Sequence, residues 1–206
     1  MKRVRPWFLV AAMLVTLLVG LRGASNGCGT VAYLRAGAMP DEAAALDEAA
    51  RDPGHALLIL DESAQLRALA EARRVTFPLG VAEAIVSALL ILMSAGVLVG
   101  RPGAPRLARQ VLAVAAALSI ATFVLTYPMQ AQYVESLRRT AAQAELPRWA
   151  SWFLPMTPYK ALIRMLALQL VPLGLAALAL RAERSRAFFE EARVVDERPI
   201  DDEDEL

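Results

Sequence analysis

Four long apolar runs constrain the fold of this chain more than any other feature. They cover residues 6–21, 79–100, 111–127 and 159–180. A helix needs about 20 consecutive apolar residues to cross the hydrocarbon core of a bilayer, and within lipid its backbone must satisfy its own hydrogen bonds. We therefore predict an all-α membrane protein with four transmembrane helices and a helical exterior segment between the first two.

The composition favours membrane spans over one large soluble core. Hydrophobic residues make up 57% of the chain and its mean hydropathy is +0.42, whereas soluble domains are about 45–50% apolar. The net charge of +1 provides no basic field for nucleic acid, so we expect no nucleic-acid partner. The predominance of Ala, Leu and Arg is typical of a GC-rich bacterial genome.

The single cysteine and the single histidine limit the available chemistry. Cys28 cannot form an intramolecular disulfide, and together with His55 it cannot assemble a Cys/His metal cluster. The same count excludes a pair of histidines ligating haem. We expect neither a metal nor a cofactor.

Arginine and lysine predict the orientation, because the cytoplasmic flanks of spans carry an excess of these residues. They are dense before the first run, in the short connector 101–110 and after the fourth run, whereas the other two loops are longer and richer in Asp and Glu. An even number of spans places all three basic segments on one side. We predict a multi-pass protein of the bacterial inner membrane with both termini in the cytoplasm.

The apolar runs divide the chain into six parts. These are an N-terminal anchor (1–21), an exterior helical segment (22–78), a transmembrane hairpin (79–128), an exterior amphipathic helix with an aromatic interfacial loop (129–158), a fourth transmembrane helix (159–180) and a tail that begins basic and ends acidic (181–206). Within the exterior segment we expect a flexible Gly-rich stretch at 22–30 and a helix beginning at Asp41. A second helix, capped by Asp61, would run into the next span at Pro78. Because large apolar residues are few, we expect this segment to rest on the membrane or on a partner.

The first run leaves two fates open for the N-terminus. It follows basic residues and is short for a full span, which is typical of a signal peptide or of an uncleaved signal anchor. Cleavage after Ser25 or Gly27, or lipidation at Cys28, would leave three spans. Lipoprotein sites usually carry a large aliphatic residue where this chain has Ser25, and we favour the uncleaved anchor.

Glu83 interrupts the second run in its outer-leaflet part. Lys160 and Arg164 lie four residues apart in the fourth run at a similar depth. A charge at the centre of the bilayer costs roughly 2.5–3.5 kcal/mol on insertion scales, and pairing reduces this cost. Our first interpretation is an interhelical pair of Glu83 with Arg164 or Lys160. The alternative is a proton or ion site whose polar face comprises Glu83, Ser87 and Ser94.

Two further features concern packing and anchoring. Small residues recur every four positions at 80–88 and 113–121, a spacing that lets helix backbones approach closely. Trp149, Trp152 and Phe153, next to prolines, predict an interfacial anchor, with a ligand platform as the alternative.

The sequence contains no catalytic motif of the metalloprotease, serine hydrolase, nucleotide-binding or kinase type. We therefore expect a non-enzymatic assembly, scaffold or accessory subunit. Its partners would be the lipid bilayer and either a membrane or periplasmic protein, bound through the exterior helical segment, or a second copy of the chain. The alternative is a small oligomeric transporter or channel subunit that uses Glu83. An intramembrane enzyme ranks third.

Overall fold

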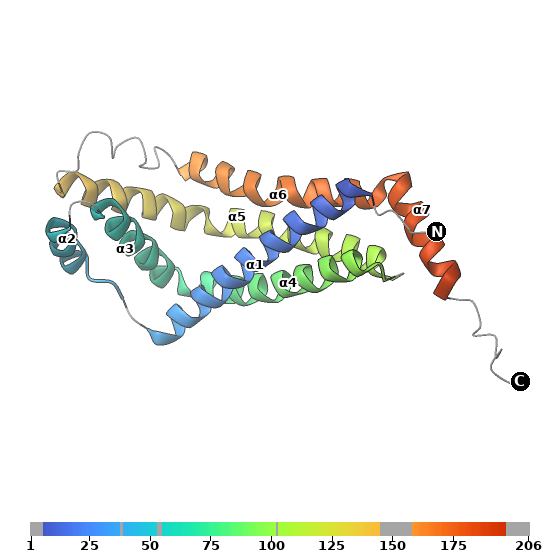
Figure 1. Ribbon diagram of the computed structural model, residues 1–206. Coiled ribbons are helices and arrows are strands. Elements are labelled where there is room, and N and C mark those ends of the chain that lie inside the picture. The colour runs from blue at the N-terminus through green and yellow to red at the C-terminus, as the bar shows by residue number, and fades with distance from the viewer. Residues whose placement is uncertain (1–5, 38, 53–54, 102, 145–157, 197–206) are drawn as a thin grey trace, which may run out of the picture.

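The computed structural model describes residues 6–37, 39–52, 55–101, 103–144 and 158–196, which form helices and no strand. In chain order the helices are α1 (Trp7–Ala36), α2 (Glu42–Arg51), α3 (Ala56–Glu71), α4 (Arg73–Val99), α5 (Ala104–Gln143), α6 (Pro158–Arg181) and α7 (Glu183–Asp196). Helices α1, α4, α5 and α6 form an elongated bundle, with α2 and α3 at one end and α7 at the other (Figure 1). The prediction of an all-α fold is confirmed for the described residues.

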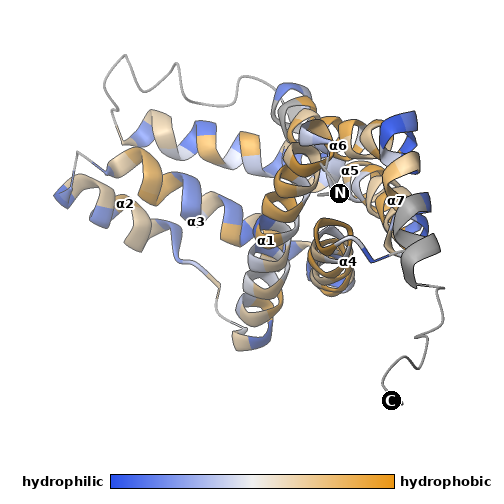
Figure 2. Cartoon of the chain, turned by 45° about the vertical axis from the view of Figure 1, so that its right-hand side comes forward, coloured by the Kyte–Doolittle hydropathy of each residue, from blue (hydrophilic) through white to orange (hydrophobic). Residues whose placement is uncertain are grey.

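Helices α1, α4 and α5 are each long and apolar enough to cross a membrane, and α6 passes the same test when joined to α7 across a bend of 58°. Large apolar side chains are exposed on the outside of the bundle, while several polar ones are buried inside it. The exposed set includes Leu14, Leu18, Ile85, Leu92, Val124, Leu125, Leu175 and Leu178, and the buried polar set includes Thr16, Ser87, Ser94 and Thr126. Figure 2 shows this apolar colouring along the bundle and a more hydrophilic colouring on α2, α3 and α7. An apolar exterior around a partly polar interior is consistent with a membrane protein.

Helices α1 and α4 meet along a seam in which buried residues alternate at spacings of three and four. In α1 these are Leu9, Met13, Thr16, Gly20, Gly23 and Gly27, and in α4 they are Thr76, Gly80, Ser87, Leu90, Ser94 and Val97. This spacing keeps one face of each helix on the other, as in left-handed helix packing. The α1–α4 seam therefore runs most of the length of the bundle.

Glycine allows the two backbones of this seam to touch. A Cβ atom on Gly27 would lie 2.7 Å from the carbonyl oxygen of Gly80 and 2.7 Å from the amide nitrogen of Ala84. The expectation of a flexible stretch at 22–30 is therefore wrong, because these residues belong to α1. Two of their glycines, Gly23 and Gly27, serve close packing with α4, which offsets glycine's low intrinsic helix propensity.

The helix that contains the third apolar run does not end at Pro128. Instead α5 continues through that proline to Gln143, and Thr126 and Met129 on either side of it are buried. Proline removes one helical hydrogen bond, but packing on both sides of it holds the helix together. The predicted amphipathic helix after Pro128 is thus the second half of α5.

That second half carries a folded unit outside the bundle. We call α2, α3 and residues 129–143 the cap. Its core consists of Ala49, Ala56, Leu60, Ala64 and Leu137, with Leu46, Tyr133 and Ala144 packed against them. The predicted start of α2 is confirmed, because the Asp41 side chain accepts a hydrogen bond of 3.0 Å from the amide of Ala43.

The junction between α3 and α4 differs from the predicted one. Asp61 is not an N-cap, since it lies inside α3 and accepts a hydrogen bond from the Tyr133 hydroxyl. The helical break falls at Ala72, where the Thr76 hydroxyl donates to the carbonyls of Leu69 (3.0 Å) and Ala72 (3.1 Å). Pro78 lies within α4. Asp61 thus contacts α5 from within α3, and a local side-chain bond marks where α3 ends.

At the opposite end, the bundle interior is apolar and α7 closes over it. Its core includes Leu9, Met13, Leu90, Val97, Leu112, Leu173, Ala176, Leu180 and Phe189. Phe189 comes from α7, and Phe188 lies against Gly100, which ends α4 with a φ of 87°. We call residues 99–109 and 180–190 the hairpin end.

Candidate functional site

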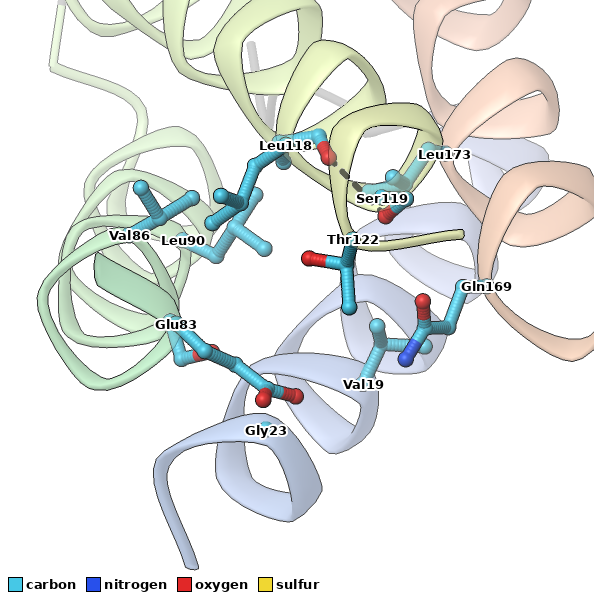
Figure 3. A pocket seen from close by; sticks show the side chains of 12 residues that line it. Val19, Gly23, Glu83, Val86, Leu90, Leu118, Ser119, Thr122, Gln169 and Leu173 are labelled. Carbon is cyan, nitrogen blue, oxygen red and sulfur yellow. Dashed lines mark hydrogen bonds between the residues drawn. The ribbon is translucent and has the colours of Figure 1, made fainter. Parts of the chain in front are cut away.

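A pocket in the bundle interior brings together polar side chains from several helices (Figure 3). It is lined by Val19 and Gly23 of α1, by Glu83, Val86, Ser87 and Leu90 of α4, by Ala115, Leu118, Ser119 and Thr122 of α5, and by Gln169 and Leu173 of α6. Its volume is about 50 Å³. Such a space holds a few water molecules but no organic solute.

Glu83 reaches this pocket because its position along α4 places it on the face of the helix that is turned inward. It lies three residues after buried Gly80 and four residues before buried Ser87, at an inward position of the α1–α4 seam. A Cβ atom on Gly23 would lie 3.8 Å from Oε1 of Glu83, so the carboxyl group stands beside the α1 backbone. The missing side chain of Gly23 makes room for the Ser87 hydroxyl, whose oxygen would lie 2.3 Å from a Cβ atom there.

Polar groups of α5 and α6 share the pocket with Glu83. In Figure 3 the Thr122 hydroxyl and the Gln169 amide both point into it. The Ser119 hydroxyl donates to the carbonyl of Ala115 at 2.9 Å, as the dashed line shows. We call Glu83, Ser87, Ser119, Thr122 and Gln169 the polar layer. Glu83 is its one ionisable member, so any proton or cation held here would be held by this carboxylate.

The polar layer ends at an apolar floor. Leu90 and Leu173 line the pocket and also belong to the core that fills the interior toward the hairpin end. Of the predicted polar face, Ser87 lies in the pocket with Glu83, whereas Ser94 is buried about two turns farther along α4 and does not line it.

The predicted ion pair of Glu83 stays a prediction. The side chain of Arg164 lies outside the described residues. Lys160 is exposed and precedes Gln169, the α6 residue in the pocket, by about 13 Å along the helix axis. What α6 places in the pocket is the amide of Gln169.

Other predicted sites are spread over the chain. The anchor residues Trp149, Trp152 and Phe153 lie outside the described residues. Cys28 is exposed on α1, and its lipidation stays a prediction. Within the described residues, no three His, Cys, Asp or Glu side chains are grouped so that they could hold a metal ion.

The sequence reasoning missed the α5 and α1 members of the site. Ser119, Thr122 and Thr126 recur every three or four residues within an apolar run, which marks one polar stripe on α5. Gly23 belongs to the glycine spacing of the α1–α4 seam. Both signals were present, but only the packing of the helices relates them to Glu83.

A second pocket lies in the cap and is lined by charged groups that pair with one another. Its volume is about 200 Å³. Arg67 of α3 pairs with Glu71 at 3.1 Å and with Glu42 of α2, and Arg139 of α5 lies 3.7 Å from Glu135. Hydrogen bonds to Glu71 and Glu42 raise the pKa of the Arg67 guanidinium. The Arg67–Glu42 pair connects α3 to α2, while the other two pairs lie within single helices. Together they leave little charge for a ligand.

Comparison of the chain with known protein families, with curated proteins and with solved structures found no match. Two features of the structure bear on function: a folded cap at one end of the bundle and a small polar layer inside the bundle.

Proposed function

We propose that the protein is a non-enzymatic subunit of a bacterial inner membrane that holds a partner protein through its cap. In this proposal α1, α4, α5 and α6 are four spans, both termini are cytoplasmic, and the cap stands on the periplasmic side. The spacing of basic residues supports this threading.

One observation carries the proposal: α5 runs unbroken from the bundle into the core of the cap. It extends roughly 22 Å beyond Pro128 at 1.5 Å per residue. Leu137, which is 1% exposed, lies in the apolar core that joins that extension to α3 and, through α3, to α2. The cap is therefore tied to the bundle by a continuous helix and offers a fixed surface to a partner outside the bilayer.

An uncleaved N-terminus is part of this proposal. Leu9, Met13 and Thr16 are buried in the bundle, and Leu9 and Met13 belong to its apolar core. Cleavage after Ser25 or Gly27 would remove these contacts together with most of the α1–α4 seam. Intact-mass measurement should therefore show no loss of about 2.5 kDa, the size of a signal-length segment. A mature chain beginning at Asn26 or Cys28 would contradict this part of the proposal.

The partner is best sought by purification in mild detergent. The cap and the segment that leads into it present two large apolar side chains to solvent, Met39 at 61% exposure and Leu58 at 65%. Exposed apolar groups of this kind are candidate anchors for a protein interface. Replacing both by serine should release a co-purifying protein that the unchanged chain retains in stoichiometric amount.

The matched control is Leu107→Ser, which alters an exposed leucine (50%) at the hairpin end. It should leave the co-purifying protein bound. If no protein co-purifies stoichiometrically, or if the cap variant retains it, the docking function is wrong.

The polar layer favours a second candidate function, a transporter or channel subunit that works as an oligomer. A carboxyl group facing the inside of a membrane bundle is a candidate for proton or cation transfer. The apolar core between the polar layer and the hairpin end argues against a pathway through one copy in this conformation. Loss of a transport phenotype in Glu83→Gln with unchanged stability would favour this second candidate.

A further inference from the structure

Arginines gather at the hairpin end from two parts of the sequence. They are Arg101, Arg106 and Arg109 around the α4–α5 connector, and Arg181, Arg184 and Arg186 around the α6–α7 bend, and all six are exposed. We call these six residues the arginine cluster. The N-terminal end of α1 lies at the same end of the bundle (Figure 1).

Packing of α7 against the ends of α4 and α5 holds the two halves of the cluster at one end of the bundle. The Phe188 ring of α7 lies 3.7 Å from the position that a Cβ atom on Gly100 would take. Gly100 directly precedes Arg101 in the chain. Phe189 is 8% exposed and belongs to the same apolar core as Ala104 and Ala108 of α5. Helix α7 is therefore held against the connector, and its arginines lie at the same end of the bundle as those of α5.

The six arginines form no ion pair with a carboxylate of the described residues. The ion pairs among these residues involve Arg51, His55, Arg67 and Arg139, all in or next to the cap. Glu183 and Glu190, the carboxylates on α7 up to residue 190, form no such pair. Arg109 donates from Nε to the carbonyl of Pro105 at 3.2 Å, which leaves the rest of its guanidinium available.

Helix α7 has the shape of an interfacial helix. It turns away from α6 by 58°. Ser185 and Phe189 face inward and are buried, whereas Arg184 and Arg186 are exposed. Glu183 and Glu190 are exposed as well, so the outer side of α7 carries charges of both signs. In the proposed threading the bundle ends here, and this side of α7 would stand at the level of the lipid headgroups.

We propose that the hairpin end binds the phosphate headgroups of anionic lipids between the α4–α5 connector and α7. Guanidinium groups form paired hydrogen bonds with phosphate oxygens, and they are less strongly hydrated than ammonium groups. Each basic residue near an anionic membrane surface contributes about a five-fold preference for it. This inference does not depend on the partner-binding function of the cap.

The test uses the full-length protein purified in mild detergent with equal amounts of phosphatidylglycerol and phosphatidylcholine of matched acyl chains. Mass spectrometry of the co-purified lipid gives the ratio of the two. Phosphatidylglycerol should be enriched, and Arg101→Gln with Arg184→Gln should lower the ratio about five-fold for each arginine that contacts a headgroup. Raising the salt concentration should lower it as well.

The matched control is Arg73→Gln with Arg74→Gln, which removes two exposed arginines near the cap. It should leave the ratio unchanged. Arg101→Lys with Arg184→Lys keeps the charge and should retain most of the enrichment, which separates loss of binding from loss of folding.

Three outcomes would overturn the proposal. One is a ratio of unity for the unchanged protein, and another is an equal loss in the Arg73 and Arg74 control. The third is displacement of phosphatidylglycerol by millimolar inorganic phosphate, because a soluble anion would then be the ligand instead of a lipid.

Discussion

The cap and the hairpin end, at opposite ends of one bundle, use their charged residues differently. In the cap, Arg67 pairs with Glu42 and Glu71 and so connects α2 to α3. At the hairpin end, the arginine cluster forms no ion pair with another described residue. The cap thus uses its charges to hold its own helices together. The hairpin end leaves its charges to the surroundings, which we infer to be anionic lipid.

The interior of the bundle also differs between the cap and the hairpin end. Toward the cap, Gly23 and Gly27 bring the α1 backbone onto α4, and the polar layer lies beside them. Toward the hairpin end, large apolar side chains such as Leu90 and Leu112 fill the space. Within a bilayer, apolar burial does not drive helices together, so backbone contact and polar bonds have more weight. We therefore expect the α1–α4 seam to be most sensitive near its glycines.

The largest expected effect comes from Gly27→Val. The new side chain would begin 2.7 Å from backbone atoms of Gly80 and Ala84, and backbone cannot move aside as a flexible side chain can. We expect separation of α1 from α4 and a loss of about 3 kcal/mol or more in the free energy of unfolding. Unfolding by titration with a denaturing detergent would measure it.

Gly29→Val is the control for that change. A Cβ atom on Gly29 meets nothing within 4 Å, and valine has a similar or better helix propensity. Its stability should be close to that of the unchanged chain. Equal losses for the two variants would show that the close backbone contact at Gly27 is not the cause of the loss.

A smaller and local effect is expected from Leu137→Ala. Leu137 is 1% exposed and lies at the centre of the cap core. Truncating it should cost about 2–4 kcal/mol, a usual range for buried leucines. Hydrogen exchange should then accelerate in α2 and α3 while α1 and α4 stay protected. If α4 loses protection as well, the cap and the bundle are one cooperative unit.

The smallest effect concerns Glu83 and separates its two possible neighbours on α6. Double-mutant cycles of Glu83→Gln with Arg164→Gln and of Glu83→Gln with Gln169→Leu would be measured by thermal melting in detergent. The sequence predicts that Arg164→Gln partly rescues Glu83→Gln, because loss of one partner leaves an uncompensated charge. The pocket geometry predicts coupling with Gln169 of about 1 kcal/mol. Additive losses in both cycles would contradict both assignments.

Local signals predicted part of this fold. The apolar runs located the long helices, and Asp41 marked the start of α2 because an N-cap acts within its own turn. The boundary predicted at residue 128 is not a helix end, because proline removes one hydrogen bond while Met129 and Leu137 beyond it are buried by packing. Asp61 matched a cap pattern, but its partner Tyr133 is distant in sequence.

The candidate site, too, could be predicted only where a local signal exists. The sequence singled out Glu83 because a carboxylate in an apolar run is costly, but it could not give the direction in which the side chain points. That direction depends on the glycines of α1, for which the sequence predicts flexibility. It also depends on which faces of α5 and α6 are turned toward the pocket. The polar layer is a property of four helices packed together, so no single run could reveal it.

In the proposed threading, the cap and the hairpin end lie on opposite sides of the membrane. Topology reporters fused after Arg51 in the cap, and after Arg106 and Arg186 at the hairpin end, test this directly. We predict an exterior signal from the first fusion and a cytoplasmic signal from the other two. A cytoplasmic signal at Arg51, or different sides for Arg106 and Arg186, would contradict the proposed threading and with it the exterior position of the cap.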